Sequence, residues 1–423
     1  MKELSNLIGA ATQYFQRGNL PQAELICRYI NRLYGEHPAV YVLLGKIALA
    51  TGLYDFAETY LRRAAEVEPG DREARESLAI ARARKEQDRA RQAHGGNENG
   101  SAGGKPRFLL IKAWGYGFWS DMDHVLGQLL LADITGRVPV VHWGDNSLFK
   151  DADRDNAFEA FFVPVSTYSL EDVRRLSSSF FPPKWSRANL QSNNVNKWDG
   201  PYSRIAGFLL LDRSEDAVVS DFHTYLNDIL PWIREDSQYY GIAAQELYRR
   251  LFRKYIRLTS ANATQVEAFW GERLAGRRPL AVHVRGSDKF IESHRLNEVN
   301  ESYHAKIAEF LKEGRCASIF LLTDSRRILD EFIGHYGEKL VYTECARTDN
   351  DTGVHYQPRS SRQQTGIEVI MDVYLAARCP CFIGNARSNV STSVLHMRDW
   401  KESEYVLFGE NVLLQPNFLL HKR

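Results

Sequence analysis

The sequence predicts an α/β protein with two lobes built on parallel sheets, preceded by a small all-α domain. Three features predict this organisation: a repeat of 34 residues near the start, a glycine-rich stretch after it, and two later series of apolar runs that alternate with helical patterns. A chain of 423 residues also exceeds the roughly 250–300 residues at which a single hydrophobic core stops growing. We therefore expect several domains, each with its own core.

The first 92 residues contain an internal repeat. Glycine, alanine and glutamate recur at a spacing of 34 positions, and Pro69 follows the second expected helix of the second copy. This pattern resembles the tetratricopeptide repeat and predicts a helical domain over residues 1–92, which serves either as a packing or self-association surface or as a docking site for a protein partner. Residues 93–106 have no large apolar side chain and are expected to form a flexible linker. The recurring residues are Gly18 and Gly52, Ala23 and Ala57, and Glu24 and Glu58.

Two series of strands and helices follow the linker. In the first, residues 107–113 form a strand, residues 120–136 a helix with Ser120 as N-cap and Gly136 as its stop, and residues 138–142 a second strand. In the second, strands are expected at residues 279–284, 318–322, 339–342 and 381–384, with helices at 302–312, 325–336 and 366–377. Residues 166–196 lack periodicity and are expected to form loops. We expect an N-terminal Rossmann-like lobe with a helical middle over residues 107–275 and a C-terminal Rossmann-like lobe over residues 276–423, with a cleft between them.

Composition and charge narrow the class of protein. The 54 basic and 53 acidic side chains nearly balance, so no excess charge favours a nucleic-acid partner. No stretch of about 18 apolar residues can cross a bilayer, and the first residues lack the pattern of a secretory signal, so we expect a cytoplasmic protein without a membrane span. The five scattered cysteines fit reduced thiols, and Cys379 and Cys381 are expected in a buried strand rather than at a metal, because no second ligand pair stands nearby.

The loop after the first strand of the N-terminal lobe has two interpretations. Gly115, Tyr116 and Gly117 join a strand to a helix, where backbone amides and the helix dipole can face an anion. Glycines at such a place also simply permit a tight turn. The sequence leaves both interpretations open.

The helix after this loop begins with two acidic residues. Asp121 and Asp123 imitate a metal-binding D-x-D pair, although acids in the first turn of a helix are favoured by its dipole whatever their function. We expect no metal there and no cofactor elsewhere. Whether the neighbouring His124 is structural or catalytic stays open.

The strongest candidate site is the charged run after the strand at residues 279–284. His283, Arg285, Asp288 and Lys289 stand at or just beyond the carboxyl end of this strand, where open α/β sheets bind ligands. Arginine can fork to diphosphate oxygens and lysine adds a second positive charge, so the run can hold a pyrophosphate as a nucleoside diphosphate leaves. Glu292 follows closely and can accept a proton from an attacking hydroxyl. The alternative is an ordinary surface loop with ion pairs.

Two further polar loops follow strands of the same sheet. They contain Asp324 after residues 318–322, and Arg387 and Ser388 after residues 381–384, so three polar loops converge on one sheet edge. Asp372 lies among apolar neighbours in the helix before the last of these strands. A buried acid needs a hydrogen-bond donor, either from the protein or from the N–H group of a bound base.

The order of these blocks is similar to that of the nodulation fucosyltransferases and of the core α1,6-fucosyltransferases of N-glycan processing. The resemblance covers about residues 107–400 and excludes the helical repeats. It is carried by residues 115–117, positions between 129 and 140, and residues 156–165, 180–185, 283–285, 319–325 and 371–379. It implies a fold of GT-B type, GDP-fucose as donor, inversion at the anomeric carbon and no metal requirement.

The same resemblance implies roles for individual residues. By matching position, Arg285 would contact the donor phosphates and Ser388 the β-phosphate, while His283 and Asp372 would contact the guanine. The other implied residues are Gly115, Tyr116 and Gly117 along the donor cleft, Lys289 beside the donor and Glu292 as the base for the acceptor.

The sequence departs from this family at two places. Gly286 stands where many relatives have a second arginine, so one phosphate contact is missing or comes from elsewhere, for which Arg387 is the candidate. Glu292 lies one residue nearer to Asp288 and Lys289 than the base of the animal enzymes. Residues 348–364, near the acceptor, are too divergent to carry over.

The sequence is compatible with three functions. The first is an inverting fucosyltransferase with a glycan or protein acceptor. The second is a transferase that uses another GDP-hexose. The third is a catalytically silent sugar-nucleotide-binding module whose helical repeats bind a partner. Release of GDP from GDP-fucose discriminates the enzyme from the silent module.

Overall fold

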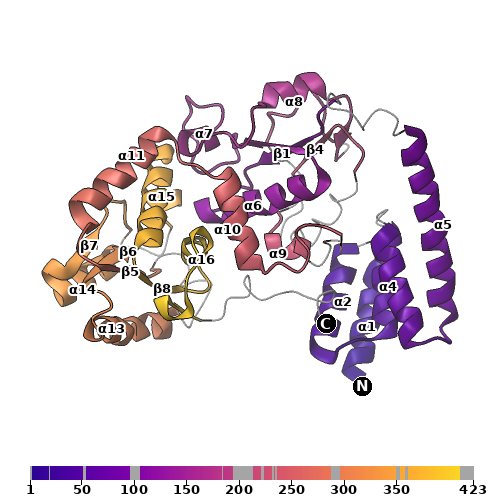
Figure 1. Ribbon diagram of the computed structural model, residues 1–423, viewed down its shortest axis with the longest axis horizontal. Helices are drawn as coiled ribbons and strands as arrows, with labels where there is room; N and C mark the ends of the chain where they lie inside the picture. Colours follow the sequence, from indigo (N-terminus) through magenta and orange to yellow (C-terminus); the bar gives the residue numbers. More distant parts are fainter. Residues whose placement is uncertain are drawn as a thin grey trace.

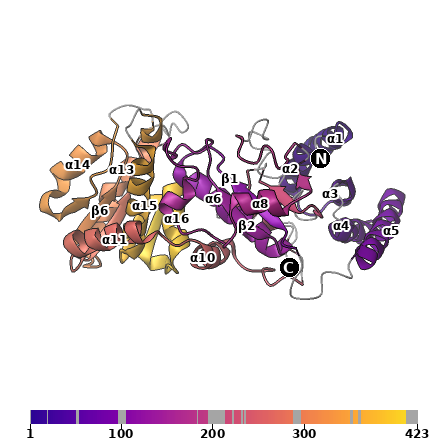
Figure 2. The same ribbon diagram turned by 90° about the horizontal axis from the view of Figure 1, so that it is seen from above.

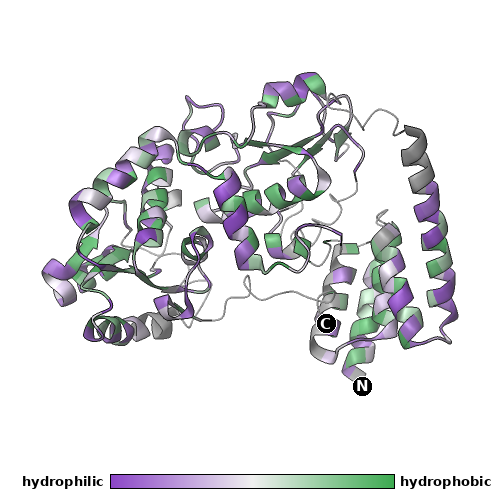
Figure 3. Cartoon of the chain, in the orientation of Figure 1, coloured by the Kyte–Doolittle hydropathy of each residue, from purple (hydrophilic) through white to green (hydrophobic). Residues whose placement is uncertain are grey.

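A helical N-terminal region and two parallel sheets make up the molecule (Figure 1). The computed structural model describes residues 2–18, 20–50, 54–95, 105–182, 184–193, 213–220, 223–230, 233, 236–286, 296–348, 353–357 and 361–409. Hydrophobic residues concentrate on the strands and on helix faces directed toward them (Figure 3). Within these ranges, no helix is both long enough and apolar enough to span a bilayer.

The N-terminal region consists of α1 (Lys2–Gln16), α2 (Leu20–Tyr34), α3 (Pro38–Ala50), α4 (Tyr54–Val67) and α5 (Arg72–Gly95). Each helix packs against the next, as the two ribbon views show (Figures 1 and 2). A small residue permits the close approach of α3 and α4, because a Cβ at Gly45 would come within 2.4 Å of Leu61 Cγ. These helices enclose a hydrophobic core of their own.

The first sheet contains four parallel strands in the order β2-β1-β4-β3: β1 (Phe108–Lys112), β2 (Val138–His142), β3 (Phe180–Phe181) and β4 (Ala217–Val219). Its helices are α6 (Phe118–Thr135), α7 (Phe158–Phe161), α8 (Leu170–Leu176) and α9 (Leu226–Ile229). The predicted N-cap of α6 is wrong. The helix starts two residues before residue 120, with Gly117 as N-cap, because the Ser120 amide already donates to the Gly117 carbonyl at 2.9 Å. The predicted stop at Gly136 is confirmed, with φ at 63°.

The expected loop region at residues 166–196 contains α8 and β3, so that expectation was wrong in part. A capping box between Ser169 and Asp172 starts α8, since each side chain bonds the backbone amide of the other. The helix has only seven residues, too few for a helical period to show in the sequence.

The second sheet contains five parallel strands in the order β7-β6-β5-β8-β9: β5 (Pro279–His283), β6 (Ser318–Leu322), β7 (Leu340–Tyr342), β8 (Cys381–Asn385) and β9 (Tyr405–Phe408). Its helices are α13 (Leu296–Lys312), α14 (Arg326–Tyr336), α15 (Arg362–Arg378) and α16 (Asn389–Met397). The predicted α/β class with parallel sheets is confirmed. Strand β8 pairs with β5 on the side away from β6, so the chain reverses its direction of progress between them. Ligands of such sheets bind outside the carboxyl ends of the strands at this switch point.

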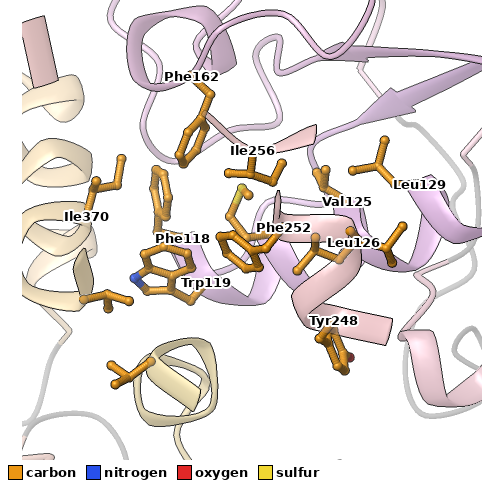
Figure 4. Packing of buried hydrophobic residues seen from close by; sticks show 14 of the residues in the cluster. Phe118, Trp119, Val125, Leu126, Leu129, Phe162, Tyr248, Phe252, Ile256 and Ile370 are labelled. Carbon is orange, nitrogen blue, oxygen red and sulfur yellow. The ribbon is translucent and has the colours of Figure 1, made fainter. Parts of the chain in front are cut away.

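Two helices, α10 (Ala244–Tyr255) and α11 (Ser260–Phe269), connect the sheets and pack against α16 and α15 respectively. One hydrophobic core extends from the first sheet to these helices and on to α15 and α16. At its centre, Phe118 and Trp119 of α6 lie between Ile370 of α15 and Phe252 of α10 (Figure 4). The two sheets are therefore joined by packed side chains as well as by the chain.

A polar contact reinforces this connection at the start of α15. The carboxylate of Asp151, in the loop after β2, accepts hydrogen bonds from the Arg362 amide at 2.6 Å and from the Ser361 hydroxyl at 2.7 Å. These bonds hold the pKa of Asp151 below its usual value, although partial burial acts in the opposite direction. Residues of the first lobe thus fix the position of α15, the helix that carries Asp372.

Replacing Gly366 with alanine tests how tightly α15 packs on the first lobe. A Cβ at Gly366 would lie 2.6 Å from Phe161 Cζ. That ring cannot yield easily, because it is fully buried and its centroid lies 5.0 Å from that of Phe118. We expect the free energy of unfolding to fall by about 1–3 kcal/mol. Gly334→Ala is the matched control, because Gly334 lies in α14 with no atom within 4 Å of the added Cβ. It should raise stability by about 0.5–1 kcal/mol in the same denaturation experiment. A stabilising Gly366→Ala would contradict the packing described.

Candidate functional site

His283, the last residue of β5, is held in one orientation at the carboxyl edge of the second sheet. Only 4% of its surface is exposed, and its Nδ1 lies 2.7 Å from Ser391 Oγ of α16. Its backbone carbonyl accepts a hydrogen bond of 2.9 Å from the Tyr303 hydroxyl of α13. Burial, assisted by the positive charge of Arg285, lowers the pKa of His283 to about 3. The imidazole is therefore neutral at physiological pH.

Arg285 and Asp324 come together across the ends of β5 and β6. The closest atoms are Arg285 Nη1 and Asp324 Oδ2, at 3.7 Å, with 17% and 22% of their side chains exposed. The other carboxylate oxygen of Asp324 accepts the Gly286 amide at 3.1 Å. Asp324 thus contacts both the Gly286 amide and the Arg285 guanidinium of the loop that is predicted to hold phosphate.

Gly286 is required by a close approach of this loop to α14. A Cβ there would lie 2.5 Å from Ser325 Cβ and 2.6 Å from Ile328 Cδ1. Ser325 is itself fixed, because it caps α14 by accepting the Ile328 amide. No side chain fits at position 286 in this arrangement, which explains physically why a second arginine is absent here.

The loop after β8 places Arg387 and Ser388 at the same sheet edge. Asn385 shapes this loop, since its side-chain oxygen accepts the Arg387 amide at 2.9 Å and its carbonyl accepts the Ser388 amide at 3.1 Å. Ser388 is 3% exposed and is the N-cap of α16, but its hydroxyl makes no capping hydrogen bond to that helix. A hydroxyl and helix amides at this position suit an anion.

Asp372 of α15 faces the end of β7. Its Oδ1 accepts a hydrogen bond of 2.6 Å from the Thr343 hydroxyl, and Cys345 Sγ lies 4.0 Å from Oδ2. Burial raises the pKa of Asp372 to about 7, against the lowering effects of Thr343 and of the Arg347 charge. Arg347 donates to the carbonyls of Thr343 and Cys345, which holds this segment in place. Asp372 therefore changes charge near neutral pH.

The glycine loop of the first lobe is closed by a carboxylate of its own helix. Asp121 accepts the Gly115 amide at 3.2 Å and the Tyr116 amide at 3.1 Å. Gly115 has a φ of 97°, which an L side chain rarely adopts, and a Cβ there would meet the Asn146 carbonyl oxygen at 2.9 Å. The sequence allows the loop to be either an anion site or a tight turn. The structure favours the tight turn for the Gly115 and Tyr116 amides, because the Asp121 carboxylate already occupies the position that a bound anion would take.

The D-x-D pattern does not bring two carboxylates together. While Asp121 faces the glycine loop, Asp123 is buried against α16, with its Oδ1 3.9 Å from His396 Nδ1. Burial raises the pKa of Asp123 well above its usual value and lowers that of His396 to about 3. In the part of the chain that the structure describes, no group of three or more His, Cys, Asp or Glu side chains is arranged to hold a metal ion.

The open question about His124 has a structural answer. The imidazole is buried, and its Nδ1 accepts the Thr224 amide at 3.1 Å. Its ring also stacks on His223, with centroids 5.2 Å apart. His124 thus holds the chain after β4 in place.

Three predicted residues lie outside the described residues, namely Asp288, Lys289 and Glu292. Their roles remain predictions. The structure brings the other predicted residues of the second lobe to one sheet edge: His283, Arg285, Asp324, Asp372, Arg387 and Ser388.

Sequence reasoning missed the residues that orient these side chains. Ser391 of α16 and Tyr303 of α13 bind His283, and Thr343, just after β7, binds Asp372. Ser391 is the third residue of α16, and nothing in the sequence around it indicates which strand end its hydroxyl contacts. Only the order of the strands, which places β8 beside β5, shows the contact.

No protein-family model matches the chain, and no curated protein matches it. Solved structures to which it is similar include the NodZ α-1,6-fucosyltransferase soaked with GDP-fucose, at 22% identity over 69% of this chain and 93% of that one, with a TM-score of 0.48. Fucosyltransferase NodZ from Bradyrhizobium follows at 22% identity over 69% and 92%, with a TM-score of 0.46. POFUT1 in complex with GDP is 14% identical over 73% and 100%, with a TM-score of 0.42. All three TM-scores lie below 0.5, so the function has to be argued from the residues of this chain.

Proposed function

We propose that this protein is an inverting glycosyltransferase that moves fucose from GDP-fucose to a hydroxyl of a glycan or protein acceptor, without a metal ion. The observation that carries the proposal is the placement of polar groups along one sheet edge, with Arg285 and Ser388 at the switch point between β5 and β8 and Asp372 beside the end of β7. A guanidinium fork and a helix N-terminus suit a diphosphate, and a carboxylate suits the N–H groups of guanine. The sequence resemblance over residues 107–400 implies that the transferred sugar is fucose.

The proposed reaction is a single displacement. The acceptor oxygen attacks the anomeric carbon, its proton passes to a carboxylate, and the bond from that carbon to the β-phosphate oxygen breaks with its electron pair staying on GDP. Arg285 offsets the charge that develops on the leaving diphosphate, and Asp324 keeps the guanidinium in place. Lys289 and Glu292 are proposed as the second cation and as the base.

Release of GDP tests the proposal. Purified protein incubated with GDP-fucose and a panel of glycan and peptide acceptors should release GDP and give a product heavier by one deoxyhexose. A parallel panel of other GDP-hexoses decides whether the enzyme is restricted to fucose. Binding of GDP-fucose without turnover on any acceptor would favour a silent sugar-nucleotide-binding module.

The helical region is the candidate for a second binding surface. We propose that α1–α5 form a tetratricopeptide-like unit that binds a protein partner or a second copy of the chain. The repeat of 34 residues and the pairwise packing of the helices support this proposal.

A further inference from the structure

Ser391 lies at the centre of a short hydrogen-bonded chain between two strand ends. Its hydroxyl oxygen accepts the amide of Asn385, the last residue of β8, at 2.9 Å. The same oxygen lies 2.7 Å from Nδ1 of His283, the last residue of β5. Ser391 is completely buried, so water does not compete for these bonds. One serine of α16 therefore ties together the two strands that flank the switch point.

The positions of the hydrogens in this chain follow from counting donors and acceptors. The Asn385 amide can only donate, so Ser391 Oγ is the acceptor of that bond. If Nδ1 of His283 also donated, the Ser391 hydroxyl hydrogen would need a third partner, and no described residue offers one. A buried donor without a partner costs about 1–3 kcal/mol. The satisfied arrangement has the hydroxyl donating to Nδ1, which leaves the imidazole proton on Nε2.

We infer that Ser391 is a positioning residue that fixes His283 as the Nε2-protonated tautomer, so that His283 offers a neutral N–H donor to an acceptor oxygen of the bound nucleotide. This inference rests on the proposed function for the identity of the ligand. The tautomer itself rests only on contacts within the chain. Among the described residues, none forms a hydrogen bond to Nε2 of His283, which leaves this group for the ligand.

Nitrogen-detected NMR of histidine tautomers tests the first half of the inference in the protein without ligand. In ¹⁵N-histidine-labelled protein, the signals that disappear in His283→Gln belong to His283. They should show a protonated Nε2 and an unprotonated Nδ1, and the ring should stay neutral throughout the neutral range. A protonated Nδ1 would overturn the inference. This measurement needs no nucleotide, so it stands even if the proposed function fails.

Nucleotide affinity in two serine variants tests the second half. Ser391→Ala removes the hydroxyl that orients the ring, and we expect GDP affinity to fall about tenfold and the His283 signals to broaden between tautomers. Ser393→Ala is the matched control, because it is the same change at another buried serine of α16 and should leave both readouts unchanged. Ser391→Thr restores a hydroxyl and should recover the single tautomer. A Ser391→Ala protein with wild-type affinity and a single His283 tautomer would contradict the positioning role, whereas wild-type protein that binds no GDP would contradict only the proposed function.

Discussion

Replacing Arg285 with alanine is expected to weaken GDP binding at least about 100-fold and to abolish turnover with it. A charge-assisted hydrogen bond contributes about 1.5–3 kcal/mol, and a guanidinium can make two of them to a diphosphate. The side chain is 17% exposed, so these bonds are only partly weakened by solvent. Titration calorimetry with GDP measures the effect.

Two further variants make the Arg285 experiment specific. Arg285→Lys keeps the charge but loses the planar fork, so its affinity should lie between those of wild type and Arg285→Ala. Arg327→Ala removes an exposed arginine of α14 near the same sheet edge and should leave the affinity unchanged. Melting temperatures show whether each variant is folded. If folded Arg285→Ala binds GDP within about twofold of wild type, Arg285 does not hold the phosphates.

The affinity for GDP-fucose is expected to fall by up to about tenfold per pH unit below pH 7 and to stay constant above it. In the free protein, burial raises the pKa of Asp372 to about 7. The N–H groups of guanine require the carboxylate form, so binding lowers this pKa, and protonation competes with the ligand at acidic pH. GDP-fucose is the better probe, because the terminal phosphate of GDP itself gains a proton in the same range.

Two variants isolate Asp372 as the titrating group. Asp372→Asn cannot gain a proton, so its affinity should be weaker at pH 8 and flat across the range. Asp330→Asn, an exposed acid of α14, should keep the wild-type profile. Calorimetry in buffers of different ionisation enthalpy should also show one proton released on binding below pH 7. A wild-type affinity that is flat from about pH 5.5 to about 8.5 would exclude Asp372 from nucleotide binding.

The sheet strands were the most predictable part of this fold. The runs that became β5, β6 and β8 are buried along their whole length, and such runs read as continuous apolar segments. Strand β9, which was not predicted, lies at the sheet edge and is only half buried, so its apolar signal is weaker. Burial alone was not sufficient, because β4 is also buried along its whole length but has only three residues, too few to stand out as an apolar run.

The candidate site was predictable only where residue chemistry and strand ends coincide. Arg285 and Ser388 follow this rule, because a charged or polar residue beside a buried run stands out in the sequence, whereas Asp372 stood out as an acid among the apolar residues of a helix. The occupation of the Gly115 and Tyr116 amides by Asp121 was not predictable, because the sequence does not distinguish which carboxylate of the first helical turn faces the loop. The same holds for Ser391, which meets a strand 108 positions earlier in the chain.

The aromatic core around Phe118 and Gly366 limits how this chain can be recombined with other proteins. Because rings of the first lobe fill the space above a glycine of α15, a C-terminal lobe taken from another protein would need an equally small residue at that place. Exchange of whole lobes to change donor choice would create either a void or a clash. For the proposed transferase, nucleotide preference is therefore more readily altered by local changes around His283 and Asp372 than by exchange of whole lobes.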